Sequence, residues 1–219
     1  MKFKKLVLVA SLVLGVTYLG NAQTIVGSAH DFSSLSWNNA APISTNLRGQ
    51  ICAPCHAPHN TNDTTAGVTA PLWNHQLSST SSYTVYTGYA LSATVGQPDG
   101  TSKLCLSCHD GTVALSNFRT YSTGTTYMTG TSNLGTDLSN DHPISFTYDA
   151  ALATADGKLF DPTSHVSGLA GGGTIDHDML ENHKVQCKSC HDPHNGGGAA
   201  HLLIKSNTGS ALCLTCHNK

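Results

Sequence analysis

The sequence Cys187-Lys188-Ser189-Cys190-His191 contains two cysteines that are separated by two residues and followed at once by a histidine. The same pattern occurs three more times in the chain. We number the motifs 1 to 4 in chain order, at residues 52–56, 105–109, 187–191 and 213–217. All eight cysteines of the 219-residue chain belong to these motifs. The pattern therefore indicates one chemical task that is repeated four times.

The Cys-x-x-Cys-His spacing is the attachment signature of c-type haem. Two thiols reach the two vinyl groups on one edge of the porphyrin, and the next residue turns its imidazole onto the iron. The motifs thus predict four covalently bound haems c. The predicted thioether residues are Cys52, Cys55, Cys105, Cys108, Cys187, Cys190, Cys213 and Cys216. The predicted proximal iron ligands are His56, His109, His191 and His217.

Paired cysteines have three other common uses besides haem attachment. Four pairs can form two zinc sites of four thiolates each. They can also form disulfides in an oxidising compartment, or act as thiol redox motifs. None of these uses explains a histidine at the same position in all four motifs, so haem is the favoured interpretation.

The amino-terminal residues have the features of a secretory signal peptide. Lys2, Lys4 and Lys5 precede an apolar run at residues 6–19, and small residues lead to a predicted cleavage site after Ala22. No later run approaches the ~18 apolar residues of a membrane helix, so we expect an exported chain without a membrane span in its mature form. With 11 basic and 13 acidic residues, the chain does not fit a basic nucleic-acid binder.

The composition predicts a fold that depends on its cofactor. Leu, Ile, Val and Phe make up 35 of residues 23–219, a share just under the ~20% at which disorder becomes a serious alternative. Four haems supply the missing apolar core. The predicted fold class is a haem-organised multihaem cytochrome with little regular secondary structure, short helices at the CxxCH sites, few short strands and long loops. The candidate strands are residues 81–90 and 144–148, and residues 122–139 form a candidate surface loop.

An internal repeat divides the mature chain. Residues 52–60 and 187–195 share the pattern Cys-x-x-Cys-His-x-Pro-His-Asn, and residues 104–109 and 212–217 share Leu-Cys-Leu-Ser/Thr-Cys-His. The first pair carries an insertion at roughly residues 76–101. We predict a signal peptide at residues 1–22 and a tetrahaem domain at 23–219, with motif pairs at about 23–120 and 140–219.

Nine histidines outside the motifs are available as second axial ligands, whereas the mature chain has only Met128 and Met179. Ligation of every iron by two histidines is therefore expected. His59 and His194 each follow a proximal histidine by three residues, too closely to reach the opposite face of the same haem. We assign His59 to the haem of motif 2 and His194 to that of motif 4.

His142 and His30 are the other two predicted distal ligands, and His75 is the runner-up. His142 is held extended by the proline that follows it. The remaining spare histidines are more typical of solvated loops; they are His165, His177, His183 and His201.

Several segments resemble known families. Residues 187–194 and 212–217 are similar to the doubled CxxCH motif of multihaem cytochromes. Residues 29–33, 71–74 and 134–143 resemble exported tetrahaem cytochromes of the OmcE type, whose members form extracellular filaments of stacked haems. This resemblance points to His142 and His30 as ligands and implies head-to-tail self-assembly. His30, close to the predicted new amino terminus, is then a candidate ligand for an iron in the next subunit, at motif 1 or motif 3.

The expected function is electron transfer rather than catalysis. All four motifs end in histidine, and there are enough spare histidines to close every iron, so no catalytic residue is predicted. The first reading is a polymerising extracellular electron conduit at the cell surface. The alternatives are a soluble periplasmic shuttle or a donor subunit for a reductase, and a multihaem redox enzyme ranks below both. Expected partners are redox proteins or extracellular acceptors, with no nucleic acid.

Overall fold

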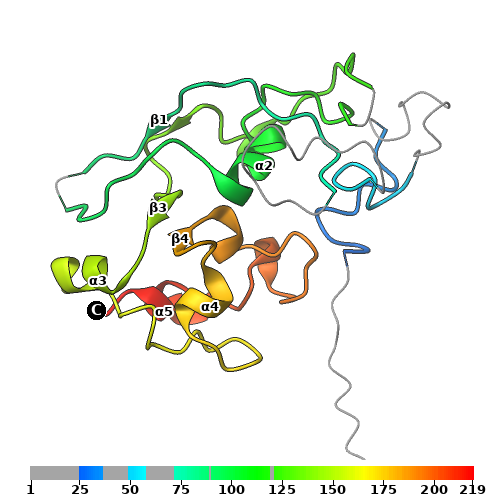
Figure 1. Ribbon diagram of the computed structural model, residues 1–219. Helices are drawn as coiled ribbons and strands as arrows, with labels where there is room; N and C mark the ends of the chain where they lie inside the picture. Colours follow the sequence, from blue (N-terminus) through cyan, green and yellow to red (C-terminus); the bar gives the residue numbers. More distant parts are fainter. Residues whose placement is uncertain (1–24, 37–48, 58–71, 89, 119–120) are drawn as a thin grey trace, which may run out of the picture.

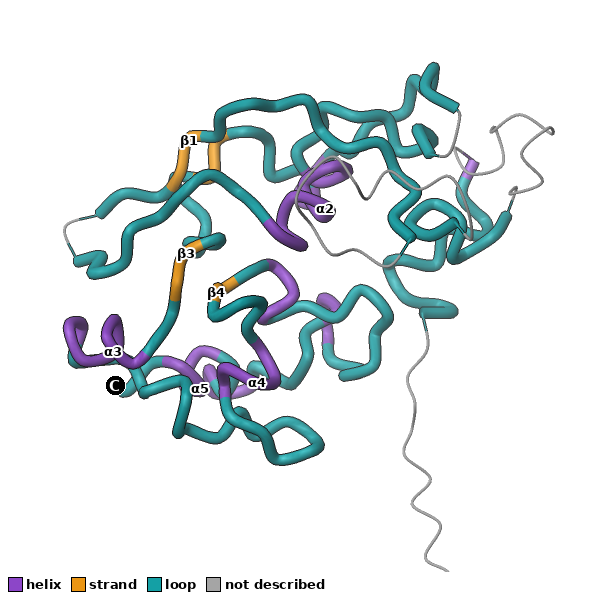
Figure 2. The backbone as a smooth tube through the Cα atoms, in the orientation of Figure 1, coloured by secondary structure: helices purple, strands orange, loops and turns teal. Residues whose placement is uncertain are grey.

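Loops form most of the computed structural model, which describes residues 25–36, 49–57, 72–88, 90–118 and 121–219. The predicted signal peptide and His59 lie outside these residues. Figure 2 shows that short helices and strands are separated by long loops. This arrangement confirms the predicted fold class, a chain with few short helices and strands and little regular structure.

The helices of the described residues are short, and the longest of them is α2. The α-helices are α2 (Gly100–His109), α3 (Ala150–Asp156), α4 (Ile175–Met179) and α5 (Cys213–Cys216). The 3₁₀ turns are η3 (Gly130–Ser132), η4 (Cys187–Ser189), η5 (Ala200–Leu202) and η6 (Thr208–Ser210). No described helix has the length and apolar character needed to cross a membrane.

Two small sheets contain the strands. In the first, β1 (Thr84–Val85) runs parallel to β2 (Asp137–Leu138). In the second, β3 (Phe146–Thr147) runs antiparallel to β4 (Lys184–Val185). The predicted strands at 81–90 and 144–148 thus contain only two strand residues each. The candidate loop at 122–139 contains η3 and β2. Leu138 of β2 is buried against Tyr83 and Leu106.

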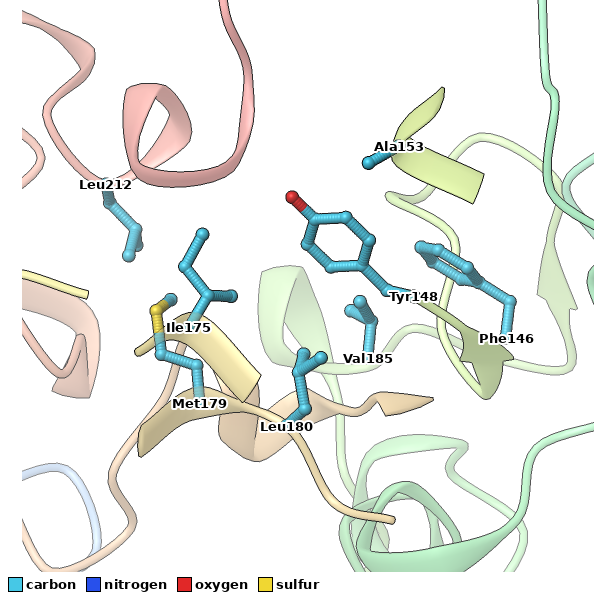
Figure 3. Packing of buried hydrophobic residues seen from close by; sticks show 8 residues of the cluster. All are labelled: Phe146, Tyr148, Ala153, Ile175, Met179, Leu180, Val185 and Leu212. Atoms are coloured by element: carbon cyan, nitrogen blue, oxygen red, sulfur yellow. The ribbon is translucent and has the colours of Figure 1, made fainter. Parts of the chain in front are cut away.

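Figure 1 shows α2 and β1 on one side of the molecule and α3, α4 and α5 on the other, with β3 and β4 between them. The largest apolar cluster belongs to the second side and contains eight buried residues, from Phe146 to Leu212. Ile175, Leu180 and Val185 lie around Tyr148 in this cluster (Figure 3). The clusters around α2 contain at most three buried residues each.

Candidate metal centres

Each of the four motifs folds as a tight turn. Motif 2 ends α2, motif 3 begins with η4 and motif 4 begins with α5. In motifs 1, 3 and 4, the amide of the histidine donates to the carbonyl of the first cysteine, at 2.8, 3.0 and 3.0 Å respectively. This is the i to i−4 bond of a helical turn. The expected short helices are therefore present at motifs 2, 3 and 4, and motif 1 is a single hydrogen-bonded turn.

The eight cysteines, all of which are described, form no disulfide. Burial raises the pKa of the Cys55 thiol to about 11 and that of Cys108 to about 12. Addition of a thiol to a haem vinyl group gives a thioether, which carries no charge. A buried site that keeps the thiol neutral therefore also suits the attached form. In the described part of the chain, no three His, Cys, Asp or Glu side chains gather around a site for a bare metal ion.

Cysteines of different motifs lie next to each other. The Cys105 thiol donates a hydrogen bond to the sulfur of Cys187, which raises the pKa of Cys105. Cys108 of motif 2 interacts electrostatically with Cys55 of motif 1. In the second half, Cys190 of motif 3 interacts with both cysteines of motif 4. Electrostatic interactions between cysteines thus link motif 1 to motif 2, motif 2 to motif 3, and motif 3 to motif 4.

Three proximal histidines face a second histidine at nearly the same distance. The ring centroids of His56 and His194 are 6.1 Å apart. Those of His109 and His30 are 6.2 Å apart, and those of His217 and His142 are 6.4 Å apart. Each pair thus joins one motif to a histidine from a distant part of the chain.

This spacing fits an iron ion between the two rings. A bond from a metal to an imidazole nitrogen is about 2.0–2.1 Å long, so two rings on opposite sides of one metal have centroids about 6 Å apart. Rotation about the metal–nitrogen axis does not change this distance. The interplanar angles of 16°, 45° and 80° in the three pairs are therefore all compatible with ligation of one iron.

Backbone carbonyls hold the outer nitrogen of four of the histidines in these motifs and pairs. In the proximal histidines, His109 Nδ1 lies 2.8 Å from the Ser132 carbonyl oxygen, and His191 Nδ1 lies 3.0 Å from the His201 carbonyl oxygen. In the distal histidines, His30 Nδ1 lies 3.2 Å from the Pro193 carbonyl oxygen, and His142 Nδ1 lies 2.9 Å from the Pro143 carbonyl oxygen. A carbonyl oxygen only accepts, so Nδ1 is the protonated nitrogen and the lone pair is on Nε2. Hydrogen bonding of this kind orients metal-bound histidines.

The ionisation of the imidazoles also suits a metal ligand. Burial lowers the pKa of His30, and the neighbouring imidazoles of His109, His194 and His191 lower it further. Burial likewise lowers the pKa of His217, which faces His142. The neutral imidazole is the form that binds a metal. The spacing of the pairs therefore fits iron, and the lowered pKa values of His30 and His217 favour the neutral form that binds it.

The histidine pairs in the structure differ from the pairs expected from the sequence. His194 faces His56 of motif 1 rather than motif 4, because the turn at residues 192–195 lies beside motif 1. His142 faces His217 of motif 4. His30 lies within its own chain, where its ring is beside His109 of motif 2 and bonded to the carbonyl of Pro193. The described contacts of His30 are therefore with residues of its own chain.

His75, the runner-up ligand, has a different environment. It is only 1% exposed, with Nδ1 2.9 Å from the carbonyl oxygen of Gln76 and Nε2 3.2 Å from that of Ala114. Its Nε2 also lies 3.5 Å from the sulfur of Cys108. Because both ring nitrogens face backbone carbonyls, His75 is placed to support motif 2 from the side.

The other spare histidines have other partners in the described structure. His177 and His183 pair with Asp178 and Asp176, and His165 stacks on Phe160 at 3.8 Å. His201 has a positive φ of 60°. Its backbone carbonyl accepts the hydrogen bond from His191 Nδ1. The carbonyl partners of the ligands were missed from the sequence, because backbone groups leave no signal in residue identity.

Comparison with protein families bears on motifs 3 and 4. Residues 177–219, which contain motifs 3 and 4, match the family model described as "Doubled CXXCH motif". A search of curated proteins finds no match to the chain. The match covers 43 of the 219 residues, and a doubled CXXCH motif supports the attachment of more than one haem c and a role in electron transfer.

Proposed function

We propose that this protein is an exported tetrahaem cytochrome that carries electrons through closely packed haems, each with two histidine ligands. The observation that carries the proposal is the set of three histidine pairs at 6.1–6.4 Å. Haem iron supplies a one-electron couple. When imidazoles hold both axial positions, no position is left for a substrate, so the residues favour electron transfer over catalysis.

The pairs support three distal assignments in this proposal: His194 for motif 1, His30 for motif 2 and His142 for motif 4. For motif 3 the repeat supplies the fourth. His59 follows His56 just as His194 follows His191, and His194 crosses to motif 1. By the same relation, we propose His59 as the ligand for the haem of motif 3. The sequence alone assigns His59 to motif 2, but in this proposal His30 serves that motif because it lies beside His109.

The stoichiometry and the ligation can be tested on the wild-type protein. Intact-mass spectrometry is expected to show residues 23–219 plus four haems. Electron paramagnetic resonance is expected to show low-spin ferric iron throughout. A smaller number of haems in fully matured protein would contradict the stoichiometry. A high-spin population that responds to nitrite or cyanide would favour a redox enzyme instead.

The assignment of His194 can be tested with pairs of variants. His194→Ala is expected to convert one iron to high spin. This effect should vanish when motif 1 can no longer bind haem, in the background Cys52→Ala/Cys55→Ala. It should persist in the matched background Cys213→Ala/Cys216→Ala. The opposite pattern would return His194 to motif 4, as the sequence alone suggested.

The finer part of the proposal is that the protein polymerises outside the cell as an electron conduit. Its support is the resemblance of residues 29–33, 71–74 and 134–143 to filament-forming cytochromes. In this proposal His30 serves its own chain, so a contact that does not use His30 joins the subunits. Electron microscopy of exported material should show filaments. Strictly monomeric protein at high concentration would make the soluble periplasmic shuttle, or a donor subunit of a reductase, the better description.

A further inference from the structure

A buried hydrogen-bond network joins the two halves of the repeat where α2 meets η4. Its centre is Gln186, the residue before motif 3, which is 2% exposed. The Gln186 side-chain nitrogen donates to Asp99 Oδ1 at 2.7 Å, and its side-chain oxygen accepts from Ser145 at 3.0 Å and from Ser102. One amide thus ties β4 and η4 to the start of α2. We call Gln186, Ser102, Ser145 and Asp99 the amide clamp.

Ser102 carries the clamp to the cysteines. Its side chain is completely buried, and its hydroxyl donates to Gln186 while accepting from the backbone amide of Cys187 at 3.0 Å. Ser102 and Cys105 are three residues apart on α2 and so lie on the same face of the helix. On that face, the Cys105 thiol meets the sulfur of Cys187. The clamp therefore lies directly beside the contact between motifs 2 and 3.

The surroundings leave the clamp little freedom. The backbone amide of Gln186 donates to the hydroxyl of Ser189 at 2.9 Å, which orients the turn that begins motif 3. Lys184 pairs with Asp99, and Thr101 donates to Glu181 at 2.6 Å. At Gly100, where φ is +50°, an added Cβ would lie 2.8 Å from the Gln186 side-chain nitrogen. Both sequence and packing therefore hold this amide in one orientation.

We propose that the amide clamp is a positioning device that sets the spacing between the haems of motifs 2 and 3. This inference rests on the proposed function. An apolar contact would hold α2 against η4 without fixing its register, whereas directional hydrogen bonds to a buried amide select one arrangement. Because the sulfurs of Cys105 and Cys187 each bind the edge of a haem, the register of α2 against η4 decides how closely the two edges approach. Gln186 and Ser102 are positioning residues, since they act through the cysteines.

The test measures coupling between haems rather than activity. Ser102→Ala removes the bridging hydroxyl, and Gln186→Leu removes the amide. Ser102→Thr restores a hydroxyl at the same place. Asn117→Leu is the matched control, because Asn117 is another buried amide, 7% exposed, that donates to Gln76 and accepts from Gly124 outside the clamp. For each protein, the readouts are the number of haems by mass, the spin state, the bisignate Soret circular dichroism and the magnetic broadening between ferric haems.

We expect four low-spin haems in every variant, with weaker Soret coupling and less magnetic broadening in Ser102→Ala and Gln186→Leu. Ser102→Thr should retain the wild-type coupling between haems. Asn117→Leu should be less stable than the wild type but should also retain this coupling. Unchanged coupling in folded Ser102→Ala would overturn the proposal, as would an equal loss in Asn117→Leu. If Gln186→Leu fails to fold, Ser102→Ala and Ser102→Thr still decide the question. Fewer than four low-spin haems in the wild type would instead overturn the proposed function on which the clamp rests.

Discussion

At each histidine, the partner of Nδ1 decides which nitrogen is available to a metal. Four of the predicted ligands direct Nδ1 to a backbone carbonyl, two of them proximal and two of them distal. Such bonds restrict rotation of the ring and leave the Nε2 lone pair unprotonated. Backbone carbonyls thus orient predicted proximal and distal ligands in the same way, although the sequences around these histidines differ.

Replacing His142 should expose one iron. His142→Ala removes the ring that faces His217 at 6.4 Å, so one iron of four is expected to become high-spin while all four haems stay attached. The change is measured by electron paramagnetic resonance and intact mass. The control is His165→Ala, because His165 stacks on Phe160 and should leave all irons low-spin. A low-spin His142→Ala protein would show that another residue closes motif 4.

Replacing His75 should affect stability but not ligation. His75→Ala leaves the carbonyls of Gln76 and Ala114 without the imidazole. A buried polar group that loses its partner costs about 1–3 kcal/mol, so the midpoint of guanidinium unfolding should fall while the iron stays low-spin. His177→Ala, at a side chain that is 81% exposed, should change neither property. A new high-spin signal in His75→Ala would make His75 an axial ligand.

Among the elements, α3 shows how local sequence places a motif. Its N-cap Asp149 accepts from the amide of Leu152 at 2.8 Å, and it ends at Gly157, where φ is +69°. The chain then passes Phe160, whose amide donates to the carbonyl of Cys216 in motif 4 at 2.9 Å. The Tyr148 hydroxyl, from just before the helix, donates to the Phe160 carbonyl at 2.6 Å. Both ends of α3 are therefore tied to the motif 4 region.

The cap can be tested by a pair of substitutions. Asp149→Ala removes the acceptor for the first turn of α3 and should lower the free energy of unfolding by about 0.5–2 kcal/mol. Asp149→Asn keeps a capping side chain and should stay close to wild type. Unfolding followed by far-ultraviolet circular dichroism measures the difference. Equal stability of the two variants would show that the cap does not support the helix.

The sequence predicted elements better than it predicted their partners. The motif spacing predicts the turns at motifs 2, 3 and 4, and the low content of large aliphatic residues predicts a fold dominated by loops. The repeat predicts that His194 is a ligand, but it does not reveal that the ring of His194 lies beside His56 of motif 1. The clamp was equally hidden, because Gln186 and Ser102 are ordinary polar residues until α2 and η4 meet. Contacts between segments far apart in the chain leave no local pattern.

Across the whole molecule, apolar packing is unevenly distributed. The largest cluster, with Ile175 fully buried, supports the part of the chain that carries motif 4. Around α2, Leu104 and Phe118 each form a cluster as its single buried residue. Motifs 1 and 2 therefore lie in the region with the least protein core, where the bound haems must contribute most to burial.

The chain without haem should accordingly lack a cooperative fold. Apolar burial contributes about 25 cal/mol per Å², and the small clusters beside α2 bury too little surface to offset the entropy of ordering long loops. Material produced without the haem-attachment machinery should show no sharp thermal transition by calorimetry and little dispersion of its amide NMR signals. The control is the same chain, produced with that machinery, which should melt in a defined transition. Cooperative melting of the haem-free chain would show that the polypeptide folds on its own and binds its haems as additions to a finished core. In that case, partial retention of structure around Tyr148 and Ile175 would be the first feature to examine by hydrogen exchange, because this cluster is the only large one in the described part of the chain.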